Sequence, residues 1–188
     1  MRSLGLATDL LALGGASTVE RHPDHLVVRT PGEPSFWSGS MLILPGPPGD
    51  PLTEAALFRA AFPDASHLCV VWDDPTLDPE PLREPWAALG AEVSVEDVLT
   101  REGPPSAVPV PKGYEVRELT SDEDWARSLR LALLVGVDEG YEEASHHPYL
   151  RARIDARRVQ AAQGRLRWWG VFQEVELVAQ MGLVEGEA

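Results

Sequence analysis

Carboxylates and an aromatic ring with the potential for chemistry gather in one short stretch, GVDEGYEEA. The stretch places Glu139, Glu142 and Glu143 around Tyr141, between two segments with helical spacing. Acidic side chains in such a loop suit an amine-bearing molecule, and a plain solvated loop is the alternative. We therefore take Glu139, Tyr141 and Glu142 as candidate binding residues, and the sequence identifies no catalytic base.

Two adjacent tryptophans add a further candidate. Trp168 and Trp169 are neighbours in the run RLRWWGVF, which is predicted to be a strand. Consecutive side chains of a strand point to opposite faces, so one indole belongs in the core and the other can line a cleft or an interface. Trp168 joins the candidate binding residues on this argument.

The remaining reactive side chains predict neither a metal site nor a nucleophile. His146 and His147 are adjacent at the start of a predicted helix, where neighbours point to different faces, and no third ligand is spaced to join them. We expect them to have a capping or surface role. The single cysteine, Cys69, lies in the apolar run HLCVVW, which predicts a buried, inert thiol and excludes an internal disulfide.

Composition narrows the classes of function. The chain has 188 residues, of which 44% are hydrophobic, and a formal net charge of −14. This charge argues against nonspecific binding to nucleic acid or to an anionic membrane, so the expected partner is a small molecule or another protein. The sequence has no apolar span long enough to cross a membrane, and one cysteine fits a reducing compartment. We expect a soluble, cytoplasmic protein.

Residues 1–100 are predicted to form a first module of mixed helices and strands. Asp50 is expected to cap a helix that begins at Pro51. The run from Ser66 to Trp72 carries no charge and is predicted as a central strand. The buried face of the capped helix is predicted to hold Leu52, Ala55, Ala56, Phe58 and Phe62. The other predicted elements are helices at 4–13 and 81–89, and strands at 17–21, 26–29, the end of FWSGSMLIL, and 92–99.

Residues 101–113 contain four prolines and no helical period, which predicts an extended linker. Residues 114–188 then form a second module in the order strand, helix, helix, strand, strand. Its first strand is predicted at 114–119, and a capping box of Thr120 and Glu123 is expected to open the first helix, which ends near Val135. The second helix is predicted at 146–163, with exposed arginines.

The last two runs, from Arg165 to Val184, are predicted to form an antiparallel hairpin. The run from Leu177 to Val184 is nearly continuous in apolar character. Such a strand is typical of the inside of a sheet that is covered on both faces. We therefore expect it to be buried, with a neighbouring strand on its far side.

The second module resembles the first half of a GNAT-superfamily N-acetyltransferase. The resemblance rests on YEVREL, TSDEDWARSLRLALL, the GVDEGYEE loop, the second helix and the hairpin RLRWWGVFQEVELVAQMGLV. It implies acetyl transfer from acetyl-CoA to a small-molecule amine or a protein N-terminus, with the 139–143 loop beside the acceptor cleft. In that family a Q/R-x-x-G-x-G/A loop at the start of a helix holds the coenzyme A pyrophosphate, and this sequence has no such run after Val184.

The first module is similar to a degenerate form of the same fold. The similarity is to tandem GNAT proteins, whose first domain lacks a functional cofactor site. It rests on the runs HLVVRTPGEPSFWSGSMLIL and PWAALGAEV. It places the phosphate loop at 45–51, where Pro47, Pro48 and Pro51 have no N–H to donate and Asp50 adds a negative charge. The resemblance implies α/β modules, each with a mostly antiparallel mixed sheet flanked by helices, and weak or absent activity in this 188-residue form.

Three alternatives remain open. The chain can be a non-catalytic binding module that associates, as a homo-oligomer for example, through an exposed edge at 177–184. The two modules can instead share one sheet, with the strand at 66–72 beside the strand at 177–184. Alternatively, the sequence is a shortened reading frame. The acceptor and the oligomeric state are not encoded in any motif.

Overall fold

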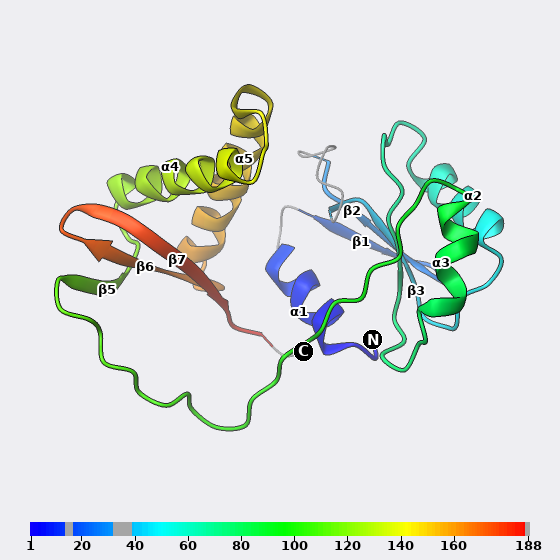
Figure 1. The fold of residues 1–188 in the computed structure, drawn as a ribbon, viewed down its shortest axis with the longest axis horizontal. Helices are drawn as coiled ribbons and strands as arrows, with labels where there is room; N and C mark the ends of the chain where they lie inside the picture. Colours follow the sequence, from blue (N-terminus) through cyan, green and yellow to red (C-terminus); the bar gives the residue numbers. More distant parts are fainter. Residues whose placement is uncertain (14–16, 32–38, 187–188) are drawn as a thin grey trace. The chain divides into compact units, whose positions relative to one another are not determined.

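The computed structural model describes residues 1–13, 17–31 and 39–186 (Figure 1). The chain divides into two compact units, one over residues 1–100 and the other from Arg101 onward. Each unit has its own mixed or antiparallel sheet with helices packed on it. Residues 101–113, at the start of the second unit, are exposed and contain no helix or strand.

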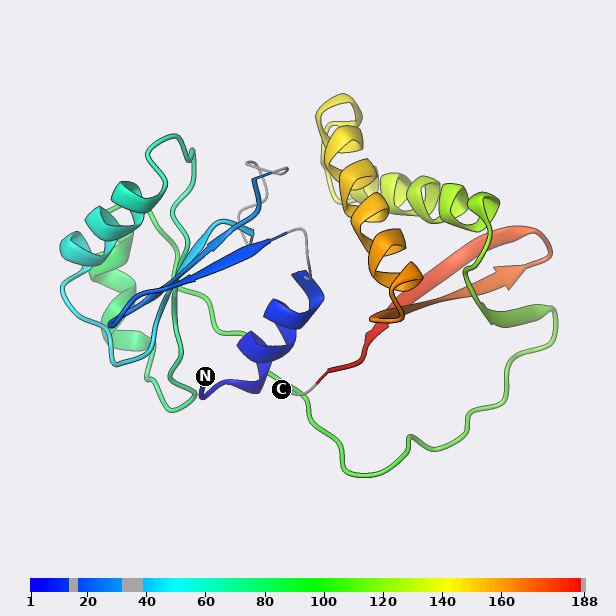
Figure 2. The ribbon, with the colours of Figure 1, turned by 180° about the vertical axis from the view of Figure 1, so that it is seen from behind.

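Unit 1 has a four-stranded sheet in the order β1-β2-β3-β4. The first two pairs are antiparallel, whereas β3 and β4 are parallel and are joined through a helix, α2. One face of the sheet carries α1, and the other carries α2 and α3 (Figures 1 and 2). The elements are α1 (Leu4–Leu13), β1 (Thr18–Arg21), β2 (Leu26–Arg29), β3 (Met41–Leu44), α2 (Pro51–Ala61), β4 (Val70–Trp72) and α3 (Glu80–Ala87).

The start of α2 confirms the predicted cap. Asp50 accepts a hydrogen bond from the backbone N–H of Thr53 at 2.9 Å, and Pro51 occupies the first turn. The predicted buried face is correct for Ala55 and Phe58, which are fully buried. It is wrong for Leu52, which is 64% exposed, and for Ala56, because the helix turns Glu54 toward the sheet instead.

Two strand predictions in unit 1 are wrong. The run 66–72 forms a strand only at Val70–Trp72, and β4 lies at the end of the strand order, not in its centre. The strand β4 lacks charge because its side chains pack against the core residues Ala55 and Trp86. An edge strand can pack against a core in this way, so the absence of charge does not identify a central strand. Residues 92–99 form no strand: Val93 enters the core, whereas Leu99 is exposed.

Unit 2 has the predicted order of elements and a three-stranded antiparallel sheet, β5-β6-β7. The helices α4 and α5 pack on one face of this sheet (Figures 1 and 2). Their shared core consists of Leu119, Trp125, Ile154, Phe172 and Leu177. The elements are β5 (Tyr114–Glu118), α4 (Asp122–Asp138), α5 (Glu143–Ala162), β6 (Leu166–Gln173) and β7 (Glu176–Val184).

The capping box of α4 lies one residue later than predicted. Ser121, not Thr120, is the N-cap, and its partner is Asp124, not Glu123. Asp124 is the capping partner because its buried carboxylate is also held by Arg117. The two terminal nitrogens of Arg117 donate hydrogen bonds to it at 2.6 and 2.9 Å. This hydrogen-bonded guanidinium, helped by the N–H groups of Thr120 and Ser121, holds the pKa of Asp124 well below its usual range.

The prediction that the run 177–184 is buried on both faces is wrong. Within β7 only Leu177 is buried, and Met181 is 60% exposed. The reason is that helices cover one face, and among the described strands β7 pairs with β6 alone. The described strands of the two units form separate sheets, with β4 paired to β3 and β7 paired to β6.

The Arg117–Asp124 pair predicts a pH dependence of unit 2. Because the pKa of Asp124 is depressed in the folded state, its stabilising effect is fully present above the ordinary carboxyl pKa of about 4 and is lost as pH falls below it. Asp124→Asn should cost about 2–3 kcal/mol of unfolding free energy at pH 7 and flatten the stability profile below pH ~4. Urea unfolding across this pH range measures both effects.

Asp138→Asn is a matched control, because Asp138 ends the same helix and is exposed. It should leave both the stability and its acid dependence unchanged. An equal loss of unfolding free energy in the two variants would show that the contact between Asp124 and Arg117 does not stabilise unit 2.

Candidate functional site

The predicted acidic loop is shorter than expected, because the two helices of unit 2 extend into it. Glu139 caps the end of α4, and Glu142 is the N-cap of α5, so only residues 139–142 separate them. The carboxylate of Glu142 accepts the backbone N–H of Ser145 at 3.0 Å, and the hydrogen bonds from Ser145 lower its pKa. Glu142 therefore has a structural task, whereas Glu139 is exposed and has no such contact.

Tyr141 belongs to an aromatic stack on the outside of α4 and α5. Its ring lies parallel to that of His146, with the centroids 4.5 Å apart, and Tyr149 follows at 5.3 Å from His146. The imidazole covers Gly136, where a Cβ atom would lie 2.6 Å from the ring. A capping or surface role was expected for both histidines. His146 instead packs against α4, whereas His147 is exposed.

Trp168 lies on the helix-facing side of β6 and is part of a polar cluster within the core. Its Nε1 donates to the side-chain oxygen of Gln180 at 3.0 Å, and the buried hydroxyl of Ser128 donates to the same oxygen. The guanidinium of Arg157 lies 4.4 Å from the centroid of the indole. Burial, with the nearby charge of Arg153, lowers the pKa of Arg157 to about 10.

The four predicted site residues are therefore not brought together. Glu139, Tyr141 and Glu142 lie at the junction of α4 and α5, whereas Trp168 lies under α5 on the sheet. In the part of the chain that the structure describes, no hydrogen bond, ion pair or ring contact joins Trp168 to the other three. Sequence analysis also missed Ser128 and Gln180, whose polar pairing links two elements far apart in the sequence.

A more informative site lies in unit 1, in the loop between β3 and α2. Glu54, which is 8% exposed, accepts the backbone N–H of Gly49 at 2.5 Å and the Nε1–H of Trp72 at 3.0 Å. The carboxylate of Glu54 thus accepts a hydrogen bond from a backbone N–H of the loop that leads into α2. From the sequence, Glu54 was expected only to lie in the first turn of the helix. The feature that could have revealed its role is that a carboxylate occupies the face of α2 that packs toward Trp72.

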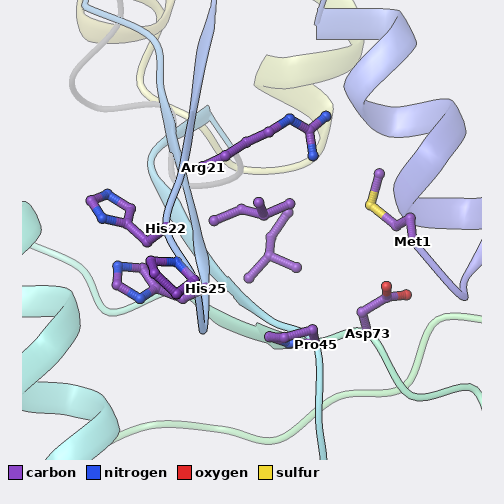
Figure 3. Close-up of a pocket in the computed structure, with 9 residues that line it drawn as sticks. Met1, Arg21, His22, His25, Pro45 and Asp73 are labelled. Atoms are coloured by element: carbon purple, nitrogen blue, oxygen red, sulfur yellow. The ribbon is translucent and has the colours of Figure 1, made fainter.

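A cavity of about 280 Å³ lies near the ends of β3 and β4, on the face of the sheet that carries α1 (Figure 3). Arg21 and Met1 line it together with the apolar side chains of Leu26 and Ile43. Asp73, at its edge, accepts the backbone N–H groups of residues 2 and 3 at 2.7 and 2.6 Å. The cavity was not predicted from the sequence, and its mixed lining of Arg21, two histidines (His22 and His25) and apolar side chains identifies no particular ligand.

Comparison with family models, with curated proteins and with solved structures found no match for this chain. Among the described residues, no group of three or more His, Cys, Asp or Glu side chains could hold a metal ion. None of the described helices is both long and apolar enough to span a membrane. The burial of Cys69 raises the pKa of its thiol to about 11, which is the state of an unreactive cysteine.

The contacts of Glu54 predict a stability effect that is specific to its carboxylate. Glu54→Ala should lower the unfolding free energy of unit 1 by about 2–3 kcal/mol, because two donors lose their acceptor. Glu54→Gln should cost less, since one amide oxygen can still accept. Urea unfolding followed by tryptophan fluorescence measures both, and Trp72 reports the local change.

Glu84→Ala is the matched control, because Glu84 is an exposed carboxylate on α3 of the same unit. It should leave stability unchanged within experimental error. If Glu54→Ala were equally neutral, Glu54 would not be the acceptor that holds this loop.

Proposed function

We propose that this chain belongs to the GNAT acetyltransferase superfamily and is weakly active or inactive as this 188-residue form. One observation carries the proposal. In unit 1 the loop at 45–50 joins a strand to the N-terminus of a helix that leads to a parallel neighbouring strand, and this is where the resemblance places the pyrophosphate of acetyl-CoA. The carboxylate of Glu54 is bonded to the Gly49 donor of that loop.

The same loop explains the loss of cofactor affinity. Diphosphates bind at helix N-termini because several backbone N–H groups converge on the anion. Here Pro47, Pro48 and Pro51 supply no N–H, and the two carboxylates Asp50 and Glu54 repel a phosphate. A cofactor would have to displace an anion that is covalently part of the site.

The superfamily reaction transfers an acetyl group from the thioester to an amine. The protein aligns the two substrates, accepts a proton from the amine and polarises the thioester carbonyl. No base is identified in this chain. The acceptor, a small-molecule amine or a protein N-terminus, would meet the acidic junction of α4 and α5, where the side chain of Glu139 is exposed and Tyr141 exposes its ring.

A loop graft tests the assignment. Isothermal titration of the natural chain with millimolar acetyl-CoA should give no saturable binding. A variant that carries a Q-x-x-G-x-G sequence at 45–50 together with Glu54→Ala should gain binding of ADP and coenzyme A in the millimolar range, because the donors are restored at the helix N-terminus.

The same graft without Glu54→Ala is the control, and it should bind more weakly because the carboxylate still competes. Saturable binding by the natural chain would show that an intact cofactor site exists elsewhere. A folded double variant without any binding would contradict the assignment of this loop.

A second function is favoured by a different observation, the exposed edge of β7. We propose as the alternative that the chain is a non-catalytic module that associates through this edge, because an apolar strand edge without a partner is prone to pair with another strand. Sedimentation at tens of micromolar distinguishes this function from a monomeric one.

A further inference from the structure

The arginines of α5 differ in how their charges are balanced. Arg151 and Arg158 each form an ion pair with an aspartate. Arg157 instead lies over the ring of Trp168, and in the described part of the chain it has no ion pair with a carboxylate. The chain has 30 acidic and 16 basic residues, so a partly buried arginine without a carboxylate partner is unexpected.

The surroundings of Arg157 disfavour its positive charge. Burial, and then the like charge of Arg153 one turn earlier on α5, lower the pKa of the guanidinium. Buried charges in proteins are normally paired, and strongly perturbed groups gather at functional sites. A ligand that balances the charge of Arg157 would be an anion.

Trp168 determines how Arg157 presents its hydrogen-bond donors. The carbon at the centre of the guanidinium lies 4.4 Å from the centroid of the indole, in a cation–π contact. Such a contact uses one face of the guanidinium and leaves the N–H groups at its edge available. These N–H groups form a planar fork that matches two oxygens of a carboxylate or a phosphate.

A polar network holds the indole of Trp168 in place. Its Nε1 donates to the side-chain oxygen of Gln180 at 3.0 Å, and the buried hydroxyl of Ser128 donates to the same oxygen. The amide nitrogen of Gln180 donates in turn to the backbone carbonyl of Ser128 at 3.3 Å. The indole also covers Gly182, where a Cβ atom would overlap the ring. These contacts fix the ring beneath Arg157, as in a pre-organised binding site.

We infer that Arg157, held over Trp168, binds an oxyanion, which is the phosphate or carboxylate group of a small molecule. Arg157 is partly exposed, so an ion from solvent can reach it. The charge of Arg153 adds to the attraction and favours a phosphate dianion over a single carboxylate. The site lies in unit 2 and uses no residue of the loop before α2, so it is independent of the cofactor assignment proposed above.

Anion titration of the whole chain tests the inference. The indole N–H signal of Trp168 is identified in a proton–nitrogen correlation spectrum by its absence from Trp168→Phe. This signal should shift saturably with inorganic phosphate in the millimolar range and more weakly with acetate. Sodium chloride at the same ionic strength should give no saturable shift. A tighter response to acetate would keep the site and assign it to a carboxylate.

Two variants of Arg157 separate its charge from its fork of donors. Arg157→Gln removes the charge and should abolish the saturable shift. Arg157→Lys keeps the charge without the fork and should bind phosphate about tenfold more weakly. Arg158→Gln is the matched control, because Arg158 is the next residue of α5 and its charge is already paired with Asp122. It should bind phosphate as the wild type does.

The outcomes decide the inference in either direction. A wild-type signal that responds to phosphate and to chloride alike overturns it, and so does a saturable shift that Arg157→Gln retains. Circular dichroism verifies that each variant is folded. If Arg157→Gln does not fold, Arg157→Lys decides, because a folded lysine variant with unchanged affinity would show that the guanidinium fork does not bind the anion.

Discussion

Backbone N–H groups at the start of a segment need an acceptor, and in this chain buried carboxylates supply it. Asp73 accepts the N–H groups of residues 2 and 3, Glu54 that of Gly49, and Asp124 those of residues 120 and 121. A buried carboxylate is costly unless several donors converge on it, and each of these three has at least two. The N-terminal segment, the loop before α2 and the start of α4 all depend on this interaction.

This constraint also limits what unit 1 can bind. An anion-binding loop works by leaving N–H donors unpaired until the ligand arrives. Glu54 reverses that arrangement, because a carboxylate fixed to the chain meets the Gly49 donor at a very high effective concentration. The indole N–H of Trp72, on the parallel neighbour of β3, holds the carboxylate in place. Anion binding by this loop is therefore opposed by an occupied donor as well as by the prolines.

Sequence patterns predicted the features that nearby residues determine. The cap at Asp50, the strands β1 and β2 and the order of elements in unit 2 depend on neighbours in the chain, and these predictions are confirmed. The position of β4 and the strand expected at 92–99 depend on which strands pair, and no local pattern encodes pairing. The cap at Glu142 was missed for the same reason: sequence chemistry marks it as a binding residue, and only the fold shows that its carboxylate accepts the N–H of Ser145.

The apolar run in β7 carries information even though its predicted burial is wrong. A strand edge that faces water can hold charged side chains at little cost, as the β5 edge does with the exposed Glu115. An edge without charge over the same sheet has no such protection, although β6 satisfies only one side of it. The sequence pattern was that of a strand with two neighbours, and the structure shows one. The apolar side chains of β7 are exposed because helices cover one face of the sheet and β6 is its one neighbour among the described strands.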